Sequence, residues 1–238
     1  MKVKTAMVMA AGLGTRMRPL TDHKPKPLVE VAGKPLIAYA FDRLRLAGVS
    51  KAVVNVHYLP EQVEAYLADC ASDLDIIISD ERSQLLETGG GLVQALPMIK
   101  GEPFFCINSD AIWTDGEVDA LTRLASAWDA ATMDALLLLV PRERAFSHRG
   151  NGDFSIDDAG RPVRRGAAPT APFVYTGVQL LSRAFLNDAP HGPFSTNILW
   201  DRAIAKGRLF ALEHVGDWFD IGSPQAIAPT EEALRQND

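Results

Sequence analysis

Residues 12–18 contain two glycines followed by two arginines, at every second position. Gly12 and Gly14 precede Arg16 and Arg18, and the whole segment directly follows an apolar run. Glycines allow a backbone to turn sharply after a strand and to bring its N–H groups close to a phosphate. Arginines beside such a turn can make charge-assisted, bidentate contacts with phosphate oxygens. The segment is therefore a candidate phosphate-binding loop.

Neither of two common phosphate-binding motifs accounts for this loop. The dinucleotide-binding pattern G-x-G-x-x-G needs a glycine at position 17, where the chain has Met17. The Walker A pattern needs Gly-Lys followed by Ser or Thr, whereas the nearby Gly33-Lys34 is followed by Pro35. A tight turn with solvated arginines remains an alternative at this point.

A second cation follows in a rigid setting. Lys26 stands between Pro25 and Pro27, which fix the neighbouring backbone and present the lysine outside regular structure. Such a lysine is suited to a second phosphate contact, and a solvated loop lysine is the alternative. Between residues 12 and 34 there are five basic and two acidic residues, although the whole chain has a net charge of −6. One basic segment in an acidic protein favours a small anionic ligand.

The overall composition limits the class of protein. The 238 residues are 47% hydrophobic and 23% charged, which is typical of a folded globular protein. The acidic balance does not favour nucleic acid, whose phosphates call for a clustered basic excess. No apolar run approaches the roughly 20 residues that cross a bilayer. The start lacks the apolar stretch of a signal peptide, so we expect a cytoplasmic protein.

Strands and helices must position these side chains, and they alternate through the first 140 residues. Continuous apolar runs predict buried strands at 5–10, 52–57, 74–79, 103–108 and 133–140. Apolar residues at helical spacing predict helices at 34–47, 60–68, 91–98 and 116–128. This alternation is typical of βαβ units, in which helices cover both faces of a parallel sheet. Ligands of such sheets bind at the carboxyl ends of the strands.

The remaining residues are less regular. Residues 150–172 are polar and rich in Gly, Pro and Asp, and they predict two short strands at 153–156 and 162–164. A strand at 173–181, a helix at 195–206, a strand at 208–213 and a helix at 224–235 complete the expected elements. We expect one α/β domain over residues 1–238, with the polar segment forming a lobe over the sheet.

Three segments in order resemble the signature of sugar-1-phosphate nucleotidylyltransferases. They are 9–21 (MAAGLGTRMRPLT), 25–28 (PKPL) and 32–36 (AGKPL). The resemblance covers essentially the whole chain and is strongest over residues 6–36. It implies a Rossmann-like α/β fold with a mostly parallel sheet, helices on both faces and a small β-rich sugar-binding lobe. Residues 1–140 would be the nucleotide-binding core, and residues 141–238 the lobe and closing elements.

The resemblance implies that the enzyme joins a nucleoside triphosphate to a sugar 1-phosphate and releases pyrophosphate. The attacking phosphate oxygen is already an anion, so catalysis needs positioning and charge neutralisation rather than a general base. Arg16 and Lys26 would be the catalytic cations. The nucleotide would be bound by Ala11, Gly12, Gly14, Thr15, Arg16, Thr88 and Gly89. Thr88 and Gly89 belong to an ETGGG segment before the helix expected at 91–98, and the resemblance assigns them to the nucleobase.

The resemblance also implies a Mg²⁺ site made by two aspartates, because Mg²⁺ prefers one or two carboxylates with waters and substrate oxygens. Asp110 follows an expected strand and matches the family's metal-binding aspartate, although Ser109 replaces the family's usual glycine. Asp220 stands between apolar neighbours and matches the aspartate of a late W-x-D-x-G segment. The N-cap of the following helix fits Ser223 better than Asp220, because Pro224 comes next.

The sugar side is expected around a YTGV segment at 175–178, which matches a strand that lies against the sugar in the family. The predicted sugar-binding residues are Asn108, Arg149, Asp153, Thr176 and Gly177. Segments 86–91 and 148–154 are similar to those of N-acetylmuramate-1-phosphate uridylyltransferases of cell-wall recycling. Arg149 would then contact the lactyl carboxylate of muramate or the sugar phosphate, with a surface arginine as the alternative.

These resemblances favour UTP and N-acetylmuramate 1-phosphate as substrates. The alternatives are guanylyl transfer from GTP to mannose or heptose 1-phosphate, cytidylyl transfer to a choline-like phosphate, and a non-catalytic nucleotide-sensing protein. The length of 238 residues leaves no room for the C-terminal left-handed β-helix of several relatives, so we expect no acetyltransferase domain. Nothing in the sequence indicates the oligomeric state.

Overall fold

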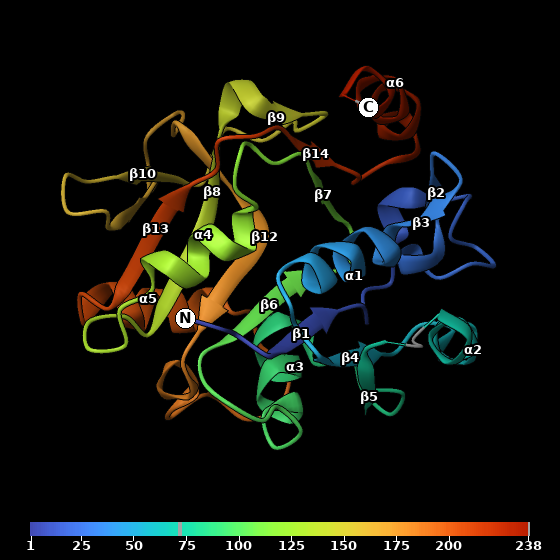
Figure 1. Ribbon diagram of the computed structural model, residues 1–238, viewed down its shortest axis with the longest axis horizontal. Coiled ribbons are helices and arrows are strands. Elements are labelled where there is room, and N and C mark those ends of the chain that lie inside the picture. Colours follow the sequence, from blue (N-terminus) through green and yellow to red (C-terminus); the bar gives the residue numbers. More distant parts are fainter. Residues whose placement is uncertain (71–72, 238) are drawn as a thin grey trace.

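A parallel sheet forms the centre of the computed structural model, which describes residues 1–70 and 73–237 (Figure 1). Four strands pair in parallel in the spatial order β6 (Phe104–Asn108), β1 (Thr5–Met9), β4 (Lys51–Val56) and β5 (Asp75–Asp80). Their apolar runs lie on a sheet that is covered on both faces, so nearly every position in β1, β4 and β6 is buried. The prediction of these four strands is confirmed.

The second half of the chain extends the same sheet. The added strands are β8 (Ala135–Pro141), β10 (Phe154–Ile156), β11 (Pro162–Arg164), β12 (Phe173–Leu181) and β13 (Leu209–Glu213). The long strand β12 lies antiparallel to β6 and β10 on one side and to β8 on the other, and β13 pairs in parallel with β8. Among the described strands of this sheet, β11 and β12 run against all the others. The sheet is therefore mostly parallel, as predicted.

Helices cover both faces. One face packs against α1 (Leu36–Leu46), α2 (Pro60–Cys70) and α4 (Ala120–Ala127). The other face packs against α3 (Glu87–Ala95) and α5 (Asn197–Ala205). Alternation along the strands explains the two cores, because Ala6 and Val8 face the first group of helices and Met7 faces the second. None of the described helices is long and apolar enough to cross a membrane.

Two small sheets were not predicted. One has the order β7 (Ala111–Trp113), β14 (Trp218–Asp220) and β9 (Ala145–Phe146). The other pairs β2 (Glu30–Val31) with β3 (Lys34–Pro35), beside the last helix α6 (Ile227–Asn237). Strands of two or three residues show no periodic pattern. The equally short β10 and β11 were predicted because they stand in a polar segment rich in Gly, Pro and Asp.

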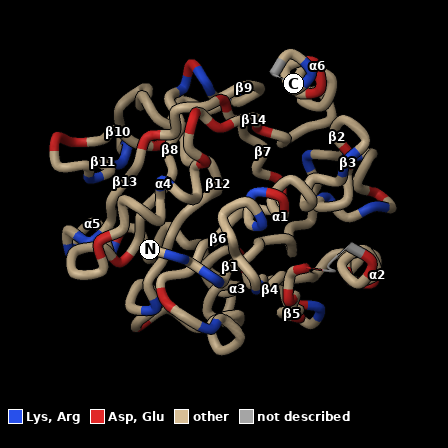
Figure 2. Tube along the Cα trace, in the orientation of Figure 1, with Lys and Arg blue, Asp and Glu red and all other residues tan. Residues whose placement is uncertain are grey.

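Charged residues of both signs are interspersed along the trace (Figure 2). The local excess of positive charge between residues 12 and 34 is therefore a feature of one segment and not of a whole face of the molecule.

Candidate active site

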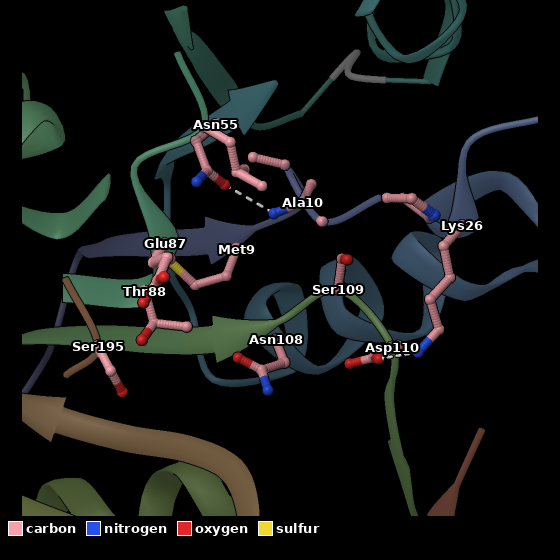
Figure 3. Close-up of a pocket in the computed structure, with 14 residues that line it drawn as sticks. Met9, Ala10, Lys26, Asn55, Glu87, Thr88, Asn108, Ser109, Asp110 and Ser195 are labelled. Carbon is pink, nitrogen blue, oxygen red and sulfur yellow. Dashed lines mark hydrogen bonds and ion pairs between the residues drawn. The ribbon is translucent and has the colours of Figure 1, made fainter. Parts of the chain in front are cut away.

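A cavity of about 390 Å³ opens where β1 and β6 end (Figure 3). This is the edge of the sheet at which ligands of such folds bind. We call it the first cavity. Its lining combines backbone of the glycine-rich loop with side chains from β4, β6 and α3: Met9, Ala10, Ala11, Gly12, Lys26, Pro27, Asn55, Leu85, Glu87, Thr88, Asn108, Ser109, Asp110 and Ser195.

The glycine-rich loop turns immediately after β1. Gly14 has φ of +64°, and a Cβ there would lie 2.9 Å from the Cβ of Lys26. The Thr21 hydroxyl donates to the Gly14 carbonyl at 2.8 Å, which fixes the turn. Gly12 differs, because a Cβ there would meet no atom within 4 Å. Gly14 is thus required by the backbone, whereas Gly12 leaves open space at the cavity wall.

A buried polar pair, missed in the sequence, anchors this loop. Asn55 and Glu81 are each 1% exposed, and Asn55 Nδ2 donates to Glu81 Oε1 at 2.7 Å. Asn55 Oδ1 accepts from the Ala10 N–H at 2.7 Å, and Glu81 Oε2 accepts from the Leu86 N–H at 3.1 Å. A Cβ at Gly91 would lie 2.7 Å from Glu81 Oε1, so this position needs a glycine. The pair joins the loop after β1 to the start of α3.

The ETGGG segment is the first turn of α3 and not a loop before it. The helix begins at Glu87, four residues earlier than predicted. A Cβ on Gly89 would overlap the ring of Phe194, and the Gly89 N–H donates to the Phe194 carbonyl at 2.8 Å. These glycines allow close packing, which explains why a pattern that suggested a loop forms a helix. Thr88 lines the first cavity, whereas Gly89 is buried behind it.

The two predicted catalytic cations have different positions, because Lys26 lines the first cavity whereas Arg16 is not among its lining residues. Lys26 begins a short 3₁₀ helix over Lys26–Leu28, so the expectation that it stands outside regular structure is wrong. Its Nζ forms an ion pair with Asp110 Oδ2 (Figure 3). Arg16 is exposed in a 3₁₀ helix over Thr15–Met17 and forms no ion pair with a described residue. Arg18 pairs instead with Asp22 at 3.4 Å.

The two predicted metal ligands are brought together by strand register. Asp110 follows β6, and the antiparallel pair β7–β14 places Asp220 opposite Ala111. A Cβ on Gly222 would lie 3.0 Å from Asp220 Oδ1 and 3.1 Å from Arg16 Nη1, so these two atoms face the same small space. The fold thus makes two contacts between distant parts of the chain: Lys26 pairs with Asp110, and Arg16 Nη1 and Asp220 Oδ1 face one small space.

The predicted donor set for a cation is two carboxylates, Asp110 between β6 and β7 and Asp220 at the end of β14. Within residues 1–70 and 73–237 there is no group of three or more His, Cys, Asp or Glu side chains that could hold a metal ion. Ser223 takes the N-cap position of a 3₁₀ helix that begins with Pro224, as predicted, so Asp220 has no capping role there.

A second cavity of about 350 Å³ adjoins the first and shares Met9, Thr88, Asn108 and Ser195 with it. Strand β12 contributes Tyr175 and Gln179 to its lining, and it pairs with β10 near one end and with β6 near the other. The register of β12 with β8 shifts between these two residues. The residues that line it are Met9, Thr88, Cys106, Asn108, Asp153, Phe154, Arg164, Tyr175, Gln179, Ser195, Thr196, Asn197 and Trp200.

The predicted sugar-binding residues have different positions around this second cavity. Asn108 and Asp153 line it, and Asp153 Oδ2 accepts from the Tyr175 N–H at 2.9 Å. Gly177 has φ of +82°, and a Cβ there would lie 2.7 Å from Asn108 Nδ2. Thr176 is buried and donates to the Leu138 carbonyl at 2.8 Å. Arg149 is exposed and lines neither cavity.

Aromatic and polar side chains that were not predicted complete the second cavity. The Tyr175 and Trp200 rings meet edge to face at 4.7 Å, and Trp200 Nε1 donates to Gln179 at 2.9 Å. Burial raises the pKa of Tyr175 well above its ordinary value, and burial raises the pKa of the Cys106 thiol to about 12. Both groups are therefore neutral at physiological pH. The sequence offered one signal for this part of the second cavity, which is Trp200 on the apolar stripe of the helix expected at 195–206.

Comparison with known proteins identifies the family and the fold. A family model described as "Nucleotidyl transferase" matches residues 5–237. The chain is 45% identical to the N-acetylmuramate alpha-1-phosphate uridylyltransferase of Caulobacter vibrioides over 98% of each chain. It is 31% identical to a probable mannose-1-phosphate guanylyltransferase 1 of Oryza sativa, over 92% of this chain and 62% of that one. A UDP-glucose pyrophosphorylase solved with UDP-glucose has the same fold, with a TM-score of 0.81 over 99% of this chain and 100% of that one, at 17% identity.

Proposed function

Because the chain belongs to the nucleotidyl transferase family, we propose that it transfers a uridylyl group from UTP to N-acetylmuramate 1-phosphate. The 45% identity to the Caulobacter uridylyltransferase over nearly the full length of both chains is the observation that carries the choice of substrates. In the reaction a phosphate oxygen of the sugar 1-phosphate bonds to the α-phosphorus of UTP. The bond from that phosphorus to the oxygen bridging to the β-phosphate breaks, and pyrophosphate leaves with both electrons of that bond.

The two adjoining cavities suit two substrates. The first cavity would take UTP, with the triphosphate on the backbone of Ala11 and Gly12 and near Arg16 and Lys26. The second cavity would take the sugar, with contacts from Asn108, Asp153 and the backbone at Gly177. Residues shared by the two linings mark the junction at which the new bond forms. Positioning two anions beside fixed cations lowers the barrier without a general base.

Asp110 and Asp220 would hold Mg²⁺. The donor set fits this ion, because Mg²⁺ prefers hard oxygen ligands and is usually bound by one or two carboxylates together with substrate phosphates. The register of β7 and β14 supports a shared site, since it sets Asp220 beside the residue that follows Asp110. When bound, Mg²⁺ would supply positive charge to the phosphate oxygens. Lys26 would keep Asp110 oriented and contact the transferring phosphoryl group.

Two alternatives are less well supported. Guanylyl transfer to mannose 1-phosphate is favoured only by relatives of lower identity, of whose length the chain spans less than two thirds. A nucleotide sensor without turnover would not need the aspartates Asp110 and Asp220 in addition to the cations Arg16 and Lys26. The proposed setting is the cytoplasm, where the product would return cell-wall muramate to synthesis.

The test is pyrophosphate release by the purified protein with Mg²⁺, UTP, GTP, CTP or ATP, and a panel of sugar 1-phosphates. We expect the fastest release with UTP and N-acetylmuramate 1-phosphate. Asp110→Asn should lower turnover by about 10²- to 10³-fold, the effect of losing one group that stabilises transition-state charge. Asp69→Asn, at an exposed position on α2, is the matched control and should retain full activity. Faster release with GTP and mannose 1-phosphate, or a fully active Asp110→Asn enzyme, would contradict the proposal.

A further inference from the structure

A histidine that the mechanism has not used contacts one of the proposed metal ligands. His148 Nδ1 lies 3.0 Å from Asp220 Oδ2. A carboxylate oxygen only accepts hydrogen bonds, so Nδ1 carries the hydrogen and donates it. The two side chains are 19% and 26% exposed, so water competes little for this bond. The imidazole therefore fixes the rotation of the Asp220 carboxylate.

The fold brings His148 to this place through a short strand and an uncommon turn. Strand β9 pairs in parallel with β14, with Phe146 opposite Phe219, so the chain after β9 runs beside Asp220. Ser147 then has φ of +61°, in the left-handed region that residues other than glycine seldom adopt. Backbone strain of this kind is concentrated at functional sites. The His148 ring packs tilted against Trp218, with centroids 5.9 Å apart.

The other edge of the ring is closed by backbone. His148 Nε2 is buried and has no hydrogen-bond partner among the described residues. A Cβ on Gly150 would overlap Nε2, so only a glycine lets the chain close over the ring at this point. A buried nitrogen without a partner is unfavourable. An apolar side chain would avoid this cost while filling the same space, which indicates that the bond from Nδ1 is what the histidine provides.

We propose that His148 is a positioning residue that holds Asp220 Oδ2 and leaves Oδ1 to bind the divalent cation. Oδ1 is the oxygen beside Gly222, in the small space that Arg16 Nη1 also faces. Carboxylates that bind metals are usually held by such hydrogen bonds, and loss of the partner lowers metal affinity by about 10- to 100-fold. The inference rests on the assignment of Asp220 as a metal ligand in the proposed function.

The test is a titration of the whole protein with Mn²⁺. The electron paramagnetic resonance signal of the free ion measures binding. His148→Leu should lower Mn²⁺ affinity by about 10- to 100-fold. His148→Asn should bind Mn²⁺ nearly as well as the parent, because the asparagine amide can donate from close to the position of Nδ1. Gly150→Ala should weaken binding by displacing the ring, and His191→Leu, at an exposed position, is the matched control and should have no effect.

Three results would overturn the inference. The first is parental Mn²⁺ affinity in His148→Leu, and the second is an equal loss of affinity in His148→Asn and His148→Leu. Because His148→Leu could fail to fold, the pair His148→Asn and Gly150→Ala gives an independent comparison. The third is parental affinity in Asp220→Asn, which would also remove the metal assignment on which the inference rests. A loss in Asp220→Asn without a loss in His148→Leu would refute the role of His148 alone.

Discussion

Replacing Gly12 by alanine tests whether the open wall of the first cavity is the place where the triphosphate meets the backbone. A Cβ at this position would have no protein atom within 4 Å, and Gly12 is not among the residues with positive φ. The added methyl group should therefore change the free energy of unfolding by no more than about 0.5 kcal/mol. We therefore expect the Gly12→Ala protein to keep its stability while its affinity for the nucleotide falls.

The loss of nucleotide affinity follows from one blocked contact. A hydrogen bond from a backbone N–H to a charged phosphate contributes about 1.5–3 kcal/mol. If the methyl group holds the phosphate away from this N–H, the dissociation constant for UTP should rise by about 10- to 150-fold. Calorimetric titration with UTP and Mg²⁺ measures this change, and a urea unfolding curve measures stability. Unchanged affinity in a stable Gly12→Ala protein would refute the reasoning, because the open space would then not be used by the nucleotide.

Three further predictions concern packing and ionisation. Gly89→Ala should lower the free energy of unfolding by up to about 2 kcal/mol, since overlap with Phe194 outweighs the gain in helix propensity; urea unfolding measures this. Burial lowers the pKa of His214 from its ordinary 6.5, so the unfolded chain binds a proton that the folded one does not, and stability falls as pH drops below 6.5. In His214→Leu the slope of unfolding free energy between pH 7 and pH 5 should be shallower. Cys106, whose thiol pKa is about 12, should resist alkylation at pH 8 until the protein is unfolded, as measured by mass spectrometry of its peptide.

The sequence predicted the elements whose hydrophobic pattern extends over several consecutive residues and does not depend on distant parts of the chain. Continuous apolar runs identified β1, β4 and β6, because a strand buried on both faces has to be apolar along most of its length. The partly exposed edge strand β5 was identified by its three consecutive isoleucines. The start of α3 was misplaced because three glycines indicate a loop when nothing is known of the backbone that packs against them. For Gly89 and Gly90 that packing comes from residues 192–194, about a hundred positions away, and for Gly91 it comes from Glu81 and Asn55.

The site was predicted in part for the same reason. Asp110 and Lys26 stand in recognisable segments, and the fold brings them together as an ion pair. The Asn55–Glu81 pair stands in no such segment, and His148 begins the recognised segment 148–154 but had no predicted role. Their roles depend on partners that are distant in sequence, such as Ala10 for Asn55 and Asp220 for His148. Arg149 lines neither cavity, so its contact with the sugar stays a prediction.

The central place of β14 in its small sheet has a consequence for the order of assembly. Strands β7 and β9 pair with β14 and not with each other. A chain still being synthesised can complete its first βαβ units early, since domains fold from the N-terminal side as they emerge. Strands β7 and β9, which adjoin Asp110 and His148, nevertheless have no strand partner until residues 218–220 arrive. Under the proposed function, translation must therefore reach the last tenth of the chain before a nascent molecule can form its cation site.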